Sequence, residues 1–120
     1  MRKTNSTDID ERTVICRMNI KITDYRDNSV LRIVLEGSLD AVTTPQLEKI
    51  LRFSLEAITE VVLDLEKLVY ISSAGLRILY AFQNAMNKVQ GRLVICNPQP
   101  DIREVFDVTG LSGILKIEEE

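Results

Sequence analysis

Apolar and polar residues alternate near the start of the chain in a way that predicts two β-strands. Met18, Ile20 and Ile22 are separated by single polar residues, which is the spacing of a strand with one buried face. The sequence Asp27-Asn28-Ser29 then favours a turn, and the largely apolar run 30–35 predicts a second strand. Because the polar connection is short, the two strands are expected to form an antiparallel β-hairpin.

Helical and strand patterns alternate through the rest of the chain. Apolar residues spaced three and four apart indicate helices, and short, nearly unbroken apolar runs indicate strands. The elements predicted in this way are a helix that begins at Thr43, a strand over 60–66, a helix over 73–89, a strand over 92–96, a short helix over 101–108 that Gly110 ends, and an edge strand over 114–117. The order β-β-α-β-α-β-α-β predicts an α/β fold, in which a mixed but mostly parallel sheet carries its helices mainly on one side.

Two of the predicted helices carry more specific expectations. The first is expected to be capped by Thr43, with Pro45 in its first turn and Gln46 satisfying a free amide. The buried stripe expected of the helix over 73–89 comprises Leu76, Leu79, Tyr80, Met86 and Val89.

Length and composition indicate a single domain. A chain of 120 residues, of which 45% are hydrophobic, is enough for one core, and the domain is expected over 16–120. Residues 1–15 are polar and are expected to form a mobile extension, although its end over 13–16 could pair with the sheet. No apolar run approaches the roughly 20 residues that cross a bilayer, and the N-terminus lacks the apolar core of a secretory signal. A cytoplasmic protein without membrane insertion is therefore expected.

The residue types present argue against most catalytic machinery. The chain has no histidine, which removes Ser-His-Asp and Cys-His arrangements and histidine ligands to zinc. Cys16 and Cys96 lie far apart without metal-ligand spacing, and Cys96 is expected in the core. The glycines form no phosphate-binding loop. We therefore expect no metal, no cofactor and no enzyme activity.

Neither the distribution of charge nor the isolated Asp64 indicates a nucleic-acid-binding or phosphoacceptor site. The net charge of −3, with scattered lysine and arginine, shows no stripe for nucleic acid, so the expected partner is another protein. Asp64 interrupts the apolar strand over 60–66, but the acidic pair of a response-regulator site is absent from the end of the first strand. We expect Asp64 to face the surface or to accept hydrogen bonds.

The segment from Leu65 to Arg77 stands out, because a strand passes through a short loop into a helix that opens with Ser72 and Ser73. Free backbone amides and the positive end of the helix dipole are exposed at such a start. On local chemistry alone, one of the serines caps the helix and the small residues that follow allow close packing. Lys67 and Arg77 flank this start, either as solvated charges or as groups that orient an acidic partner or a phosphate.

The run over 61–80, VVLDLEKLVYISSAGLRILY, resembles the signature of the STAS family, which includes anti-sigma factor antagonists and the cytoplasmic domains of sulfate transporters. The resemblance covers roughly residues 16–120. It includes Gly37-x-Leu39-Asp40, the Asn97-Pro98 turn and the ending over 108–111. It implies a STAS-like domain that acts as an anti-sigma factor antagonist rather than as an enzyme.

The resemblance also implies a phosphorylation site. When the antagonist motif Asp-Ser-Ser/Thr-Gly is matched on Gly75, Ser73 takes the place of the phosphoacceptor. Ser72 then replaces the aspartate and Ala74 replaces the second hydroxyl residue. These two departures bear on recognition by a kinase, and they leave open whether Ser73, Ser72 or neither is modified.

A partner surface follows from the same resemblance. The dephosphorylated form is expected to bind an anti-sigma factor that is itself a serine kinase, and a serine phosphatase is expected to reset the phosphorylated form. The expected contact residues are Asp40, Thr43, Thr44, Ser72, Ser73, Gly75, Leu76 and Arg77. The alternative is a STAS adaptor subunit of a transport complex or another signalling assembly, in which Ser73 is only a helix cap. Weak self-association stays open.

Overall fold

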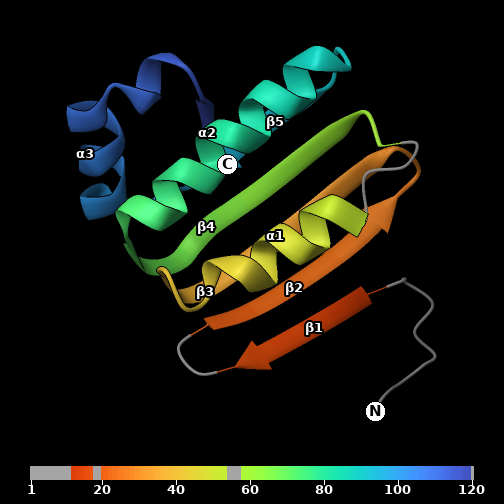
Figure 1. Cartoon of the computed structure of the whole chain (residues 1–120), viewed down its shortest axis with the longest axis horizontal. Helices are drawn as coiled ribbons and strands as arrows, with labels where there is room; N and C mark the ends of the chain where they lie inside the picture. The colour runs from red at the N-terminus through yellow and green to blue at the C-terminus, as the bar shows by residue number, and fades with distance from the viewer. Residues whose placement is uncertain (1–11, 18–19, 54–57, 120) are drawn as a thin grey trace.

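The part of the chain that the structure describes folds into a mixed β-sheet that carries three helices (Figure 1). The computed structural model describes residues 12–17, 20–53 and 58–119, with 12–17 and 53 described by their backbone alone. The strands are β1 (Arg12–Arg17), β2 (Ile20–Asp27), β3 (Val30–Leu39), β4 (Glu60–Ile71), β5 (Arg92–Cys96) and β6 (Lys116–Glu118). The helices are α1 (Thr44–Phe53), α2 (Ser73–Lys88) and α3 (Pro100–Thr109), followed by a single 3-10 turn over Leu111–Gly113.

The sheet runs in the order β1-β2-β3-β4-β5-β6, and its first half differs from its second. β2 pairs antiparallel with β3, whereas β3, β4, β5 and β6 pair parallel. The predicted hairpin and the mostly parallel sheet are therefore confirmed. β1 pairs antiparallel with β2, so the pairing considered for 13–16 is also confirmed, and β1 crosses the boundary expected between residues 15 and 16.

The three helices cover one face of the sheet, and Figure 1 shows α1 and α2 lying across it with α3 beside α2. Alternate residues of the strands point toward them, and Leu31, Ile33 and Leu35 of β3 are each no more than 2% exposed. A second, smaller cluster on the opposite face comprises Val62, Val94 and Cys96, with Val30 packed against it. The expectation that Cys96 is a core residue is confirmed.

Asp64 lies on that opposite face in a hydrogen-bonded position. Its Oδ2 pairs with Nη2 of Arg32 at 3.0 Å, and its Oδ1 accepts a hydrogen bond from the backbone N–H of Glu66 at 3.0 Å. The interpretation of Asp64 as a hydrogen-bonded strand residue is therefore confirmed.

β3 and β4 are longer than the apolar pattern predicted, and the short loop expected after residue 66 is wrong. β4 continues to Ile71, because residues 67–71 pair with the end of β3, and Leu39 lies opposite Ile71. Two register shifts interrupt this pairing. Such bulges break the period of two on which strand prediction depends, so the sequence pattern stopped short of the real strand end.

The predicted stripe of α2 is correct for Leu79 and Met86 but wrong for Tyr80 and Val89. These two side chains are 46% and 68% exposed, whereas Phe82 and Gln83 are buried. The helix presents positions 75, 79, 82, 83 and 86 to the sheet, a face that turns away from Tyr80. Gly110 ends α3, as predicted, and it adopts the left-handed conformation with φ 83°. Because a 3-10 turn follows, the last strand begins at Lys116 and not at residue 114 as predicted.

Candidate functional site

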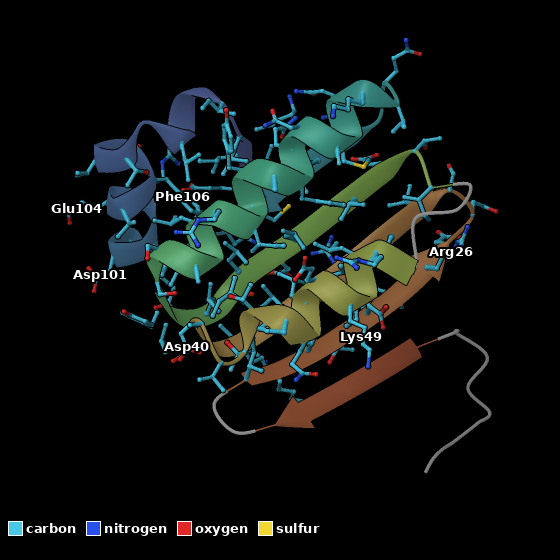
Figure 2. All side chains as sticks on the ribbon, viewed as in Figure 1. Arg26, Asp40, Lys49, Asp101, Glu104 and Phe106 are labelled. Carbon is cyan, nitrogen blue, oxygen red and sulfur yellow. The ribbon has the colours of Figure 1, made fainter. Side chains whose placement is uncertain are left out.

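The carboxyl ends of β3, β4 and β5 meet at one edge of the sheet, because these strands are parallel. In sheets of this kind, ligands and partners commonly bind outside that edge. α1, α2 and α3 all begin there, and Figure 2 shows Asp40 and Asp101 at this same end of the molecule. Gln99, just before α3, donates its Nε2–H to the carbonyl oxygen of Glu66 at 2.7 Å, which ties the third helix start to β4.

Asp40 organises the turn between β3 and α1. Its Oδ1 accepts hydrogen bonds from the backbone N–H groups of Val42 and Thr43, both at 3.0 Å. The backbone N–H of Thr43, followed by that of Val42 and the Thr43 hydroxyl, holds the pKa of the Asp40 carboxyl below its ordinary value, against a smaller opposing effect of desolvation. The Asp40 carboxylate is thus engaged in the hydrogen bonds that stabilise the turn.

Thr43 does not play the capping role that was expected. Its Oγ1 donates to the carbonyl oxygen of Ser38 at 2.8 Å and accepts from the N–H of Asp40 at 2.9 Å, so the side chain is directed back toward β3. Gln46 bonds through its backbone N–H to the Thr43 carbonyl at 3.0 Å. The reason is burial: Thr43 is only 2% exposed, and its hydroxyl satisfies buried backbone groups of the turn.

The two serines at the start of α2 have different roles. Ser72 is the N-cap, and its side-chain oxygen accepts a hydrogen bond from the N–H of Gly75 at 3.4 Å. Its own N–H donates to the carbonyl oxygen of Leu39 at 2.9 Å. Ser73 is the first residue of the helix and is exposed, as predicted. Serine and aspartate are both good N-caps, so a serine at position 72 supplies the capping chemistry that an aspartate there would supply.

Gly75 joins the helix start to the sheet. A Cβ atom at this position would lie 2.7 Å from Cγ1 of Ile71 and 2.9 Å from the carbonyl oxygen of Leu39. No real Cβ approaches other atoms so closely, so glycine is required for α2 to begin against the end of β3. The expected close packing at this glycine is confirmed.

The eight residues expected at the partner surface fall into two groups. Asp40, Ser72 and Leu76 are partly exposed, and Ser73 and Arg77 are exposed. Thr43, Thr44 and Gly75 are buried, so they can affect a contact only through the positions of the exposed residues around them.

Exposed apolar side chains at this edge were not predicted from the sequence. Val42, Val69 and Tyr70 are 58%, 61% and 53% exposed. Tyr70 lies opposite Ser38 in the β3–β4 ladder, and Val42 belongs to the Asp40 turn. Exposed apolar residues that gather around one edge are typical of protein-binding surfaces. The apolar pair Val69-Tyr70, in a segment predicted as a loop, was the feature of the sequence that could have indicated these exposed side chains.

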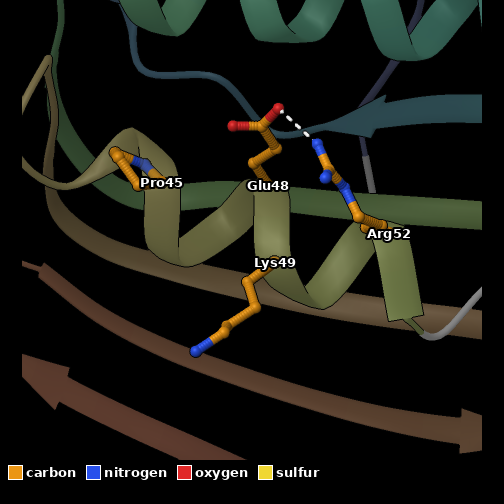
Figure 3. Close-up of a pocket in the computed structure, with 4 residues that line it drawn as sticks. All are labelled: Pro45, Glu48, Lys49 and Arg52. Carbon is orange, nitrogen blue, oxygen red and sulfur yellow. Dashed lines mark hydrogen bonds and ion pairs between the residues drawn. The ribbon is translucent and has the colours of Figure 1, made fainter.

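A hollow on α1 is lined by charges that compensate each other. A hollow of 210 Å³ on the outer side of α1 is lined by Pro45, Glu48, Lys49 and Arg52. There Arg52 Nη2 pairs with Glu48 Oε2 at 3.1 Å, as Figure 3 shows. Within 12–17, 20–53 and 58–119, no group of three acidic, cysteine or histidine residues is arranged to hold a metal ion. The same ranges contain no helix that is long and apolar enough to cross a membrane.

Known proteins resemble this chain in sequence and in fold. A protein of Bordetella bronchiseptica named "Putative anti-sigma factor antagonist BtrV" is 36% identical over 99 residues, which are 82% of this chain and 85% of that protein. The crystal structure of an anti-sigma factor antagonist from Mycobacterium paratuberculosis superposes with a TM-score of 0.72 at 26% identity, covering 82% of this chain and 85% of that one.

The fold is also that of the Bacillus cell fate determinant SpoIIAA. The anti-sigma factor antagonist SpoIIAA in its unphosphorylated form superposes with a TM-score of 0.67 at 23% identity, over 88% of this chain and 86% of that one. The phosphorylated form of SpoIIAA superposes with a TM-score of 0.57 at 20% identity, over 88% of this chain and 89% of that one. Residues 21–120 match the STAS domain family. The chain belongs to the STAS domain family.

Proposed function

We propose that this protein is an anti-sigma factor antagonist, a binding protein whose unmodified form captures an anti-sigma factor and so releases a sigma factor. The observation that carries the proposal is the arrangement at the start of α2. An exposed Ser73 opens the helix there, directly after the end of β4, which carries the exposed side chains of Val69 and Tyr70. The similarity to antagonists over most of the chain supports the same function.

Ser73 is the residue that we propose to be phosphorylated. The Ser72 side-chain oxygen is engaged with the N–H of Gly75 as the cap of α2, and Ser72 is only partly exposed, so it is less accessible to a kinase than Ser73. Ser73 is exposed in the first turn, and no hydrogen bond involves its hydroxyl within the described ranges. In the transfer, Ser73 Oγ forms a bond to the γ-phosphorus of ATP as the bond to ADP breaks. The hydroxyl proton passes to a base of the kinase.

The kinase is proposed to be the anti-sigma factor itself, and a serine phosphatase is proposed to reverse the modification. The chain's own part in this cycle is to bind and to be modified, not to catalyse. This role places it in the cytoplasm with the transcription machinery.

Phosphorylation is expected to weaken binding without unfolding the domain. A phosphate of about −1.5 to −2 charges at the N-terminus of α2 is favoured by the helix dipole and by free backbone amides. In a close interface, the same charge introduces repulsion and desolvation. Because each 1.4 kcal/mol is about tenfold in affinity, a cost of about 3 kcal/mol lowers partner affinity roughly a hundredfold.

The test begins with affinity capture by the unmodified protein, and the captured anti-sigma factor is then purified for calorimetry. Protein with phosphoserine installed at position 73 should bind it about a hundredfold more weakly and melt close to the unmodified protein. Ser73→Ala should bind normally and resist phosphorylation. Ser112→Asp, which adds charge at a partly exposed serine of the 3-10 turn, is the matched control and should bind normally. Equal affinity of the phosphorylated and unmodified forms would overturn the switch, and capture of a transport ATPase instead would favour the adaptor function.

A further inference from the structure

Ser73 and Arg77 lie one turn apart on α2, and both are exposed. Residues four apart on a helix share one face, with their Cβ atoms about 5–6 Å from each other. Arginines elsewhere in the fold have acidic partners: Arg32 pairs with Asp64, Arg52 with Glu48, Arg92 with Glu118 and Arg103 with Asp107. Arg77 makes no ion pair or hydrogen bond through its side chain with any residue that the structure describes.

We propose that, once Ser73 is phosphorylated, the Arg77 guanidinium binds the phosphoryl group within the same chain. This inference rests on the proposed modification of Ser73. A guanidinium presents a planar fork of N–H donors that matches phosphate oxygens in bidentate geometry. The order also favours the pair, because an anion that precedes a cation by four residues is the better orientation of such a pair, and the phosphate lies at the positive end of the dipole.

The pairing gives phosphorylation a second effect at the same surface. In the unmodified protein Arg77 is an exposed cation beside the helix start, able to meet an acidic group of a partner. In the phosphorylated protein the phosphate adds negative charge and also engages this cation. Because Ser73 and Arg77 are four residues apart, the phosphate on Ser73 can bind the Arg77 guanidinium and make it unavailable to an acidic group of the partner.

The experiment is a ³¹P NMR titration of the full chain with phosphoserine installed at position 73 by genetic encoding, so that no kinase is needed. A nearby cation favours the dianion and lowers the second phosphate pKa, which is about 6 for free phosphoserine. We expect the pKa in the Arg77 protein to be about 0.2 to 0.4 pH unit lower than in an Arg77→Gln variant. In about 1 M salt, where the screening length is near 3 Å, the difference should shrink.

Lys88→Gln is the matched control, because Lys88 is an exposed cation at the far end of the same helix. It removes the same net charge and should leave the phosphate pKa at the value of the unsubstituted protein. The helix dipole acts on all three proteins equally, so it cannot produce a difference between them. Identical pKa values for the Arg77 and Arg77→Gln proteins would overturn the proposal, and so would an equal rise in Lys88→Gln.

This outcome is separable from that of the proposed function. A flat titration, combined with weaker partner binding by the phosphorylated protein, would remove the Arg77 contact but keep the switch. A shifted titration, combined with unchanged partner binding, would keep the contact and remove the switch.

Discussion

The backbone of Leu39 lies against Gly75, and the carbonyl oxygen of Leu39 is 2.9 Å from the position that a Cβ at residue 75 would occupy. The same carbonyl accepts the N–H of Ser72 at 2.9 Å. The end of β3 therefore fixes the start of α2 through one hydrogen bond and one close approach. The exposed edge with Ser73 depends on this contact.

Gly75→Ala should destabilise the domain and disturb the helix start. The added methyl group meets backbone at Leu39 and a β-branched side chain at Ile71, neither of which is the far end of a flexible chain. Overpacking of this kind typically costs about 1–3 kcal/mol, measurable by urea unfolding. Gly113→Ala is the control, because nothing lies within 4 Å of a Cβ there. If the two variants proved equally stable, the close approach would have no energetic consequence.

Ser72→Ala should lower stability through loss of the α2 cap, by about 1 kcal/mol. Ser72→Asp should restore much of that loss, because aspartate caps equally well and its charge is favourable at a helix N-terminus. Thermal unfolding of the three proteins measures this order. A Ser72→Ala variant as stable as the unsubstituted protein would contradict the capping role.

Asp40 should contribute a pH-dependent part of the stability. Hydrogen bonds from the turn, first that of the Thr43 N–H, hold its pKa in the folded protein below the ordinary value of 3.8. The stabilisation is therefore complete above the unfolded-state pKa and is lost as pH falls below 3.8 toward the folded-state pKa. Urea unfolding between about pH 3 and 6 should show the stability difference from Asp40→Asn shrinking at the acid end. Curves that stay parallel across this range would refute the assignment.

The pair between Arg32 and Asp64 should be coupled more strongly than pairs on the exposed helices. Its side chains are only 27% and 13% exposed, so water screens the pair less than it screens Arg103 and Asp107, at 43% and 55%. Double-mutant cycles with Arg→Gln and Asp→Asn should give a coupling of about 1 kcal/mol for the first pair and about 0.3–0.5 kcal/mol for the second. Equal coupling energies would mean that water screens the pair on the sheet as well as it screens the pair on α3.

Periodicity alone determined most of the architecture. Residues that must face one core recur at a period of two in strands and at spacings of three and four in helices. The hairpin and the alternating elements could therefore be predicted from the chain, and the preference of helix ends for glycine predicted the stop at Gly110. The sequence also shows that the chain has no histidine and no phosphate-binding loop, which argues against histidine-dependent catalysis and nucleotide hydrolysis. The run SSAGLR over 72–77 marked the correct helix start.

The tertiary structure alone decided what each residue at that helix start does. Bulges in β4 hid the continuation to Ile71, because an extra residue inverts the in-out alternation and the pattern no longer resembles a strand. Neighbouring serines look equivalent in sequence, yet the hydrogen bond from the Ser72 N–H to the Leu39 carbonyl holds Ser72 at the cap position and leaves Ser73 exposed. Burial of Thr43 and exposure of Val69 and Tyr70 depend on which chain segments lie above them. These properties arise from contacts between residues some 30 positions apart, which local pattern cannot encode.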